Sequence, residues 1–120
     1  MRTESPDERE SPVTQAKHRI EREYGNKLSL SALAAGVHLS PNHLSAAFRR
    51  NFGVTPIKYI NAVRVQAACA LMESSGYPLK MIAERVGFED IYYFSKVFKK
   101  IAGKSPGSFR RRLAFGKATP

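Results

Sequence analysis

Two sets of mostly polar and basic residues recur fifty positions apart, at a spacing that places each set on one face of a helix. Outside their apolar stripes, the two expected helices leave Asn42, Ser45, Ala46, Arg49 and Arg50, and then Tyr92, Ser95, Lys96, Lys99 and Lys100. Positions i, i+3, i+4 and i+7 share one face of a helix. In the major groove, Asn pairs with adenine, and Lys or Arg pairs with guanine. The two faces together favour double-stranded DNA, although for any single Ser or Lys a solvated helix face is the better explanation.

The two faces belong to an internal repeat that must position them. Residues 28–60 match residues 77–110, with buried-type pairs such as Leu33/Ile82, Val37/Val86, Leu44/Phe94 and Phe48/Phe98. Each copy predicts a short helix, a turn and a longer helix, which is a helix-turn-helix pattern. The turn needs a residue that tolerates left-handed backbone: Gly87 in the second copy, and the less suitable His38 in the first. The alternative is two helical hairpins used only for packing.

Capping residues divide the chain into short helices. Ser or Thr followed by Pro predicts helix starts, glycines predict helix ends, and no stretch has strand periodicity. We expect an all-α fold of seven helices, with helix-turn-helix subdomains at about 29–52 and 79–102 joined by a long linker helix at about 56–74. The expected domain covers 12–114, between a disordered tail or linker remnant at 1–11 and a frayed C-terminus at 115–120. The expected apolar face of the linker helix is Ile57, Ile60, Val63, Ala67, Ala70 and Leu71.

The composition narrows the class of protein. The net charge is +10, and residues 25–120 alone carry 15 basic and four acidic residues. Such charge suggests a polyanionic partner without choosing between DNA, RNA and a lipid surface. The single cysteine, Cys69, excludes a disulfide framework, and no apolar run approaches a membrane span. We expect a cytoplasmic protein with no membrane partner. No nucleotide loop, nucleophile motif or metal-ligand spacing is present, so we expect no catalytic residue, no metal and no cofactor.

Two runs of the sequence resemble one known family. Residues 87–112, GFEDIYYFSKVFKKIAGKSPGSFRRR, resemble the signature of the AraC/XylS family of bacterial transcription regulators, and residues 33–64 resemble its first helix-turn-helix. The resemblance covers about residues 13–113. It implies a sequence-specific regulator, with an activator as the first interpretation, whose two recognition helices read adjacent major-groove segments. RNA polymerase is a candidate partner, and we expect the chain to be a monomer.

The resemblance places the family's base-reading residues at Asn42, Ser45, Ala46, Ile91, Tyr92, Ser95 and Lys96, and the charges on the same helix faces add Arg49 and Lys99. Together these residues are the base-contact candidates on the two helices. The phosphate-contact candidates are Arg50, Lys100, Arg110, Arg111 and the backbone amides near Leu30 and Leu79. Because Ala46 offers only apolar contact, base reading is expected to be weak in the first half, and Ile91 in the second half is likewise limited to apolar contact.

Two other functions remain open at this point. The weak first-half readers support a non-specific nucleic-acid-binding or DNA-architectural protein. DNA-repair methyl acceptors also contain a domain of this type, but they need activated cysteines, and Cys69 shows no sign of activation. The chain is expected to be either a stand-alone regulator or the C-terminal domain of a longer one.

Overall fold

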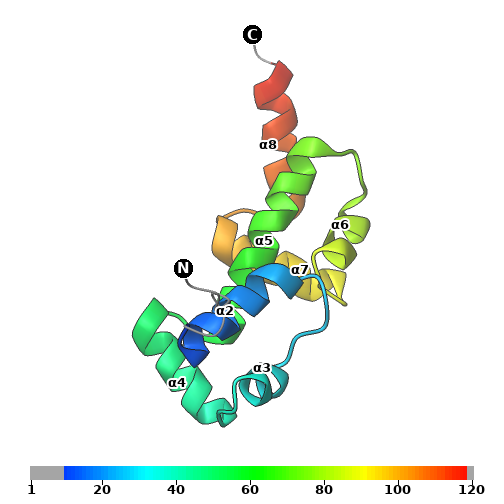
Figure 1. The fold of residues 1–120 in the computed structure, drawn as a ribbon. Coiled ribbons are helices and arrows are strands. Elements are labelled where there is room, and N and C mark those ends of the chain that lie inside the picture. Colours follow the sequence, from blue (N-terminus) through cyan, green and yellow to red (C-terminus); the bar gives the residue numbers. More distant parts are fainter. Residues whose placement is uncertain (1–9, 119–120) are drawn as a thin grey trace, which may run out of the picture. The chain divides into compact units, whose positions relative to one another are not determined.

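The computed structural model describes residues 10–118, and the side chains of residues 10–114. Seven helices and no strands lie in this range (Figure 1). They are α2 (Pro12–Glu23), α3 (Leu30–Gly36), α4 (Pro41–Phe52), α5 (Pro56–Ser74), α6 (Leu79–Arg85), α7 (Ile91–Ala102) and α8 (Pro106–Ala118). The predicted all-α fold of seven helices is confirmed.

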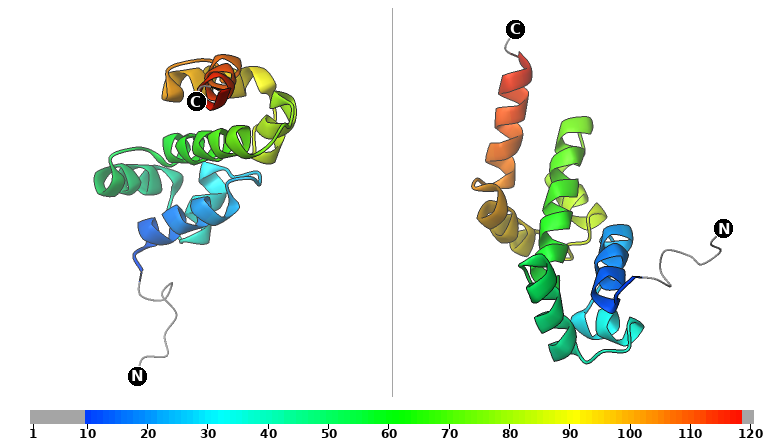
Figure 2. Two further views of the ribbon diagram at one scale, coloured as in Figure 1. Left: turned by 90° about the horizontal axis from the view of Figure 1, so that it is seen from above. Right: turned by 60° about the vertical axis from the view of Figure 1, so that its left-hand side comes forward.

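The chain forms two compact units, Met1–Ile60 and Asn61–Pro120, and the boundary between them falls within α5. In the first unit, α3, a tight turn and α4 form one helix-turn-helix. In the second unit, α6, a tight turn and α7 form the other, and Figure 2 shows both pairs from two further directions. The two second helices, α4 and α7, have the same length of 12 residues.

The described residues reach beyond both ends of the expected domain, 12–114. Ser11 caps α2, as its Ser-Pro pair predicts, and the carboxylate of Glu10 lies 2.6 Å from Nδ1 of His18. The rest of the expected tail, residues 1–9, lies outside the described part. At the other end, where we expect fraying from residue 115, α8 continues to Ala118, and residues 119–120 lie outside the described part.

Side-chain caps begin six of the seven described helices. In each case a Ser, Thr or Asp oxygen accepts a hydrogen bond from an amide of the first turn; the capping residues are Ser11, Ser29, Ser40, Thr55, Asp90 and Ser105. The exception is α6, which follows Pro78 and has no side-chain cap. At the other end, α4 and α7 both stop at a glycine with left-handed backbone, Gly53 at φ 81° and Gly103 at φ 85°.

Large apolar side chains fill the interior of each unit. The fully buried ones are Ile20, Leu33, Leu44 and Phe48 in the first unit, and Ile82, Val86, Phe94 and Phe98 in the second. The predicted apolar face of α5 is wrong in part, because Ile57 and Ala70 are exposed. The buried residues of α5 are Pro56, Ile60, Val65, Ala68 and Met72. A helix that runs through the boundary between two units contributes to two cores, so a single stripe does not describe it.

The turns of the two motifs share two equivalent hydrogen bonds but have different residues at their centres. His38 has φ 60° and Gly87 has φ 107°. The amide that follows each of them bonds to an alanine carbonyl of the preceding helix: Leu39 to Ala34 and Phe88 to Ala83, both at 2.9 Å. The first turn therefore holds a non-glycine residue in a region that costs an L-residue roughly 1–2 kcal/mol.

This difference predicts opposite effects of substitution at the two turns. We expect Gly87→Ala to lower the free energy of unfolding by about 1–2 kcal/mol, because φ 107° is strained for any side chain. His38→Gly should be neutral or stabilising by up to ~1 kcal/mol, because relief of strain is offset by the greater freedom of the unfolded chain. Urea denaturation of the two variants measures both values. Equal effects of the same sign would contradict the assignment.

Candidate nucleic-acid interface

The outward face of α4 places the first set of candidates together. Asn42, Ala46, Arg49 and Arg50 are exposed, and Ser45 is half-buried. They line one open hollow of about 600 Å³, together with Thr55. The apolar stripe on the opposite side, Leu44, Ala47 and Phe48, is buried, so the orientation of α4 is fixed by its core side. The small Ala46 lies among larger polar neighbours and leaves the surface concave there.

Thr55 is a residue of this face that the sequence reasoning did not include. It precedes α5, where its Oγ1 accepts a hydrogen bond from the amide of Lys58 at 3.3 Å. The chain reverses at Gly53 directly after α4, which returns Thr55 to the hollow beside Arg49 and Arg50. The sequence signal for this placement is the short spacing between Gly53, which ends α4, and the Thr55-Pro56 pair, which begins α5.

The outward face of α7 holds the second set. Tyr92 is 82% exposed, Lys96, Lys99 and Lys100 are exposed, and Ser95 is half-buried. Ile91 differs from the others because it is half-buried and lines a hollow of about 270 Å³ against α6. The side chain of Asp90 accepts a hydrogen bond from the amide of Tyr92 at 2.9 Å, which fixes the first turn of α7.

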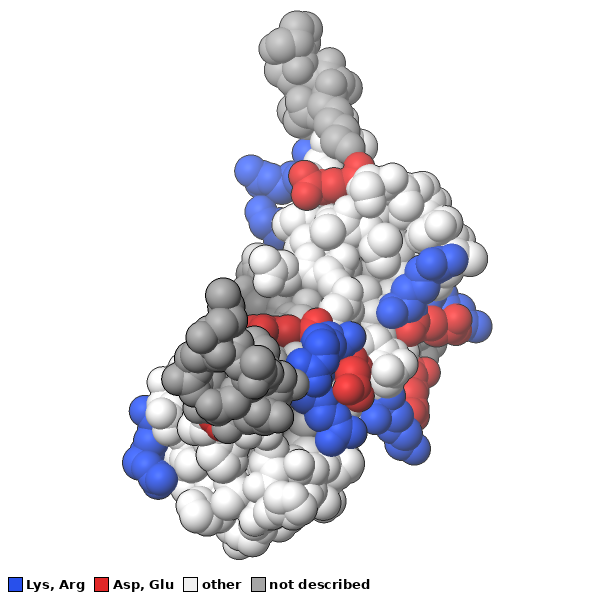
Figure 3. Space-filling view, viewed as in Figure 1, with Lys and Arg blue, Asp and Glu red and all other residues white. Residues whose placement is uncertain are grey.

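Charge on the two outward faces has one sign. Neither α4 nor α7 contains an acidic residue, and each carries two basic residues in its last turn, Arg49 and Arg50 or Lys99 and Lys100. Cations near the C-terminal end of a helix are favoured by the helix dipole, so these charges are compatible with helix stability. Elsewhere the charges are mixed, and Figure 3 shows a face on which Asp and Glu side chains lie beside several Lys and Arg side chains.

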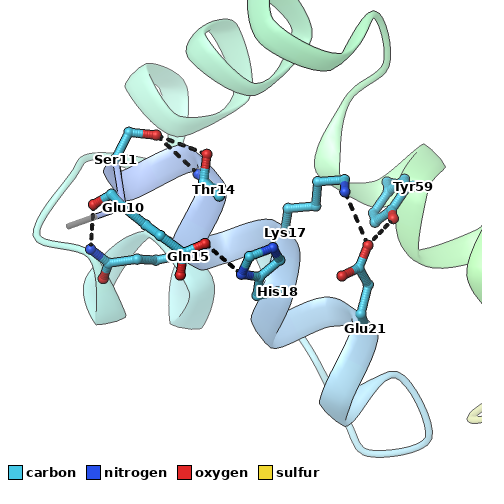
Figure 4. Close-up of polar contacts among 8 residues, drawn as sticks. All are labelled: Glu10, Ser11, Thr14, Gln15, Lys17, His18, Glu21 and Tyr59. Carbon is cyan, nitrogen blue, oxygen red and sulfur yellow. Dashed lines mark hydrogen bonds and ion pairs between the residues drawn. The ribbon is translucent and has the colours of Figure 1, made fainter. Parts of the chain in front are cut away.

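A cluster of polar and aromatic side chains contacts the buried side of α4. The ring of Phe48 lies 4.7 Å from that of Phe52 and 5.8 Å from that of Tyr59, measured between centroids. The ammonium of Lys17 lies over both Phe52 and Tyr59, at 5.5 and 5.7 Å, and pairs with Glu21 at 3.2 Å. The hydroxyl of Tyr59 donates a hydrogen bond to the same carboxylate (Figure 4). The cluster therefore connects α2, α4 and the start of α5.

This cluster perturbs two pKa values. Burial, together with the hydrogen bond to Glu21, raises the pKa of Tyr59 from 10.0 to about 12. The hydrogen bond from Tyr59 lowers the pKa of Glu21, and Lys17 adds to this shift. The second unit has Phe109 at the position equivalent to Tyr59, and its ring contacts that of Phe98 at 5.5 Å. The aromatic contact is thus repeated, but the polar link to a carboxylate is not.

The pKa shifts predict a pH-dependent stability that Tyr59→Phe should remove. The folded chain holds the Tyr59 proton more tightly than the unfolded chain, so this contribution is lost as pH rises from about 10 to about 12. The carboxylate of Glu21 has the opposite dependence, and its contribution is lost as pH falls through its lowered pKa. The urea midpoints of the native chain and of Tyr59→Phe should therefore differ most at pH values above the pKa of Glu21 and below about 10. At lower and at higher pH the two midpoints should converge. A difference that is constant with pH would contradict the prediction.

In the second unit, α7 is tied to α5 by different groups. The side-chain amide of Asn61 donates a hydrogen bond to the hydroxyl of Tyr93 at 3.2 Å. The guanidinium of Arg64 lies 5.6 Å from the centroid of the Phe88 ring, and burial lowers the pKa of Arg64. These contacts hold Tyr93, in the first turn of α7, and Phe88, which follows Gly87 in the turn between α6 and α7.

The phosphate-contact candidates outside α4 and α7 have different surroundings. Arg111 is exposed on α8. Arg110 is half-buried, and its guanidinium donates hydrogen bonds to the carbonyls of Tyr77 at 2.6 Å and Ser75 at 3.1 Å. Leu30 and Leu79 are the first residues of α3 and α6. Arg110 is therefore directed into its own unit, and we do not count it among the residues proposed to bind phosphate.

Other chemistry is sparse in the part of the chain that the structure covers. Cys69 is half-buried and forms no disulfide, and burial raises the pKa of its thiol. No group of three His, Cys, Asp or Glu side chains among the described residues could hold a metal ion. None of the helices described combines the length and apolar character that crossing a membrane requires.

The geometry defines a class of protein: a tandem helix-turn-helix domain in which both second helices present basic, acid-free outward faces. A family model described as a helix-turn-helix domain matches residues 33–112. The chain belongs to this family, the AraC-type helix-turn-helix proteins, whose members are transcription regulators.

Individual relatives agree with this assignment. The MmsAB operon regulatory protein of Pseudomonas aeruginosa is 35% identical over 91 residues, which are 76% of this chain and 30% of that protein. The C-terminal domain of the response regulator AraT from Geobacillus stearothermophilus superposes with a TM-score of 0.82 at 33% identity, with 86% of each chain covered. The DNA-binding domain of the global transcriptional factor AdpA, solved with a target DNA, has a TM-score of 0.85 at 22% identity and covers 92% of this chain and 100% of that one, which shows the shared fold. This chain spans 30 to 37% of the length of the first curated relatives it matches.

Proposed function

We propose that this chain binds double-stranded DNA sequence-specifically and acts in transcription regulation, as an activator. The observation that carries the proposal is the duplicated outward face: the equivalent pairs Asn42/Tyr92, Arg49/Lys99 and Arg50/Lys100 are polar or basic and exposed, and neither α4 nor α7 contains an acidic residue. A helix of about this width fits the major groove, and the second helix of a helix-turn-helix is the one that enters it. The solved complex of AdpA with DNA supports the same use of the fold.

Base reading is divided unevenly between the two faces. On α7, Lys96 and Lys99 can donate to guanine, Ser95 can bond to a base edge, Tyr92 offers a nearly free ring and hydroxyl, and Ile91 offers apolar contact. On α4, Asn42 can pair with adenine, Arg49 with guanine and Ser45 with either, while Ala46 in the hollow can contact only an apolar group such as a thymine methyl.

Phosphate contacts supply affinity and orientation rather than sequence preference. We assign them to Arg50, Lys100 and Arg111, with the amides at the starts of α3 and α6, near Leu30 and Leu79, as further candidates. Such contacts release counterions, so the observed affinity should fall steeply with salt.

The remaining parts of the proposal concern the setting in which the chain acts. We propose a monomeric domain that works in the cytoplasm, with RNA polymerase as the candidate protein partner, and without enzymatic activity. The raised pKa of the Cys69 thiol bears on cysteine chemistry alone, where it argues against an activated nucleophile at this position.

Enrichment of duplexes from a random pool tests the proposal. We expect the selected duplexes to share two conserved segments, with more sequence information in the segment read by α7. The control is a chain carrying both Arg49→Ala and Lys99→Ala, which removes one reading charge from each face and should enrich a less defined sequence. Equal affinity for random and enriched duplexes would overturn sequence specificity and favour the architectural alternative.

A further inference from the structure

The start of α6 is the place where the two copies of the motif differ most in how a helix is held. In the first copy, Ser29 caps α3, and its side chain accepts a hydrogen bond from the amide of Ala32 at 3.0 Å. The equivalent residue, 49 positions later, is Pro78, which has no side chain that can cap α6. The first turn of α6 thus lacks the support that begins every other described helix.

Arg110 supplies a contact at the same place. Its guanidinium reaches from α8 and donates to the carbonyls of Ser75 and Tyr77, both in the four-residue segment 75–78 that joins α5 to α6. These carbonyls follow the C-terminal end of α5, where a cation is favoured by the helix dipole. The residue equivalent to Arg110 in the first copy is Ile60, which is buried and apolar. At these two positions the first copy therefore has a capping serine and a buried isoleucine, whereas the second copy has a proline and an arginine.

The segment is held from two further sides. The guanidinium carbon of Arg85, on α6, lies 4.6 Å from the centroid of the Tyr77 ring. The hydroxyl of Ser75 donates to the carbonyl of Leu71 at 2.6 Å and accepts a hydrogen bond from the amide of Tyr77 at 3.4 Å. The planar fork of Arg110 binds two backbone carbonyls of this segment at once.

We propose that Arg110 is a positioning residue of the DNA interface rather than a phosphate contact. It fixes the segment 75–78 and thereby the first turn of α6, the helix that packs against α7. The buried Phe88, two residues after Val86 at the C-cap of α6, contacts the Phe94 ring of α7 at 5.2 Å between centroids. The statement about DNA rests on the proposed function; the statement about α6 does not. Loss of Arg110 is expected to loosen α6 and to misplace the reading face of α7.

Amide hydrogen exchange without DNA tests the structural half of the proposal. In Arg110→Ala, we expect the amides of residues 82–86 to exchange at least tenfold faster, because their hydrogen bonds depend on the fixed start of α6. Amides of residues 12–52 should not change. Arg111→Ala, an exposed arginine on the same helix, is the matched control and should leave exchange as it is.

A designed rescue makes the test more specific. Pro78 has φ −58° and ψ 149°, close to the values of the capping serines Ser11 and Ser40. Pro78→Ser should therefore create a cap on α6 and slow the exchange of Arg110→Ala by about fivefold, the size of a typical cap contribution. Unchanged exchange in Arg110→Ala, or no rescue by Pro78→Ser, would overturn the proposal.

The slope of log affinity against log salt separates positioning from phosphate binding. With an enriched duplex as probe, Arg110→Ala should weaken binding about tenfold with an unchanged slope, and Pro78→Ser should restore part of the affinity. Arg111→Ala should reduce the slope by about 0.9. A reduced slope in Arg110→Ala would overturn the proposal.

If Arg110→Ala does not fold, Arg110→Lys carries the same test, because lysine keeps the charge but cannot span both carbonyls. Failure to enrich any duplex would refute the proposed function and leave the exchange result valid.

Discussion

Replacing Phe98 with alanine is expected to lower the free energy of unfolding by about 3–5 kcal/mol, the cost of removing a fully buried ring. Phe98 has no exposed surface, and its ring lies between those of Phe94 and Phe109, with centroids at 5.6 and 5.5 Å. Because a domain's whole stability is typically about 5–15 kcal/mol, this loss should leave the second unit largely unfolded at moderate urea concentrations. Urea denaturation followed by circular dichroism measures the shift, and DNA binding should weaken in parallel because Phe98 anchors the inner side of α7.

Ile101 on the same helix provides the matched control. It is 47% exposed, so Ile101→Ala should change the free energy of unfolding by no more than about 0.5 kcal/mol. A similar cost for both substitutions would mean that the packing assigned to α7 is incorrect.

Replacing Lys96 with alanine is expected to weaken binding to the preferred duplex by about 5- to 150-fold, which is the range of one direct base contact of about 1–3 kcal/mol. The preference for one base pair should disappear with it, while the salt dependence changes little. Replacing Arg50 should weaken binding to all duplexes alike and lower the slope against salt by about 0.9. Both residues are exposed and neither has an acidic neighbour on its own helix.

Fluorescence anisotropy with the enriched duplex and a set of single base-pair variants checks both effects. Lys27→Ala is the control, since Lys27 is an exposed lysine in the loop between α2 and α3. If Lys96→Ala weakened all duplexes by the same factor, Lys96 would be a phosphate contact and not a base contact.

The repeat made most of the fold predictable. Many residues equivalent at a spacing of 49 or 50 have the same role: the turn positions His38 and Gly87 both have positive φ, and Gly53 and Gly103 end α4 and α7 in the same conformation. Capping and glycine preferences act within a few residues, so they can be read from the chain directly. The exposed sides of α4 and α7 followed from the position of the buried ones.

Long-range contacts were not predictable in this way. The bond from Tyr59 to Glu21 joins residues 38 positions apart, and those from Arg110 reach 33 and 35 residues back. An arginine in a basic run looks the same in sequence whether it faces solvent or a carbonyl. The missing cap before Leu79 was the only local sign that this helix start needed another support. The prediction for the apolar face of α5 was wrong in part for a related reason, since periodicity assumes that a helix packs on one side only.

The identical geometry of α4 and α7 has an evolutionary consequence. Each is a 12-residue helix ended by a left-handed glycine, and its buried side is separate from the side that faces outward. Mutations on the outward side of one helix can therefore accumulate while the scaffold and the other helix remain intact. A duplicated reader of this kind can acquire a new target in two small steps, with one half retaining affinity while the other changes its preference.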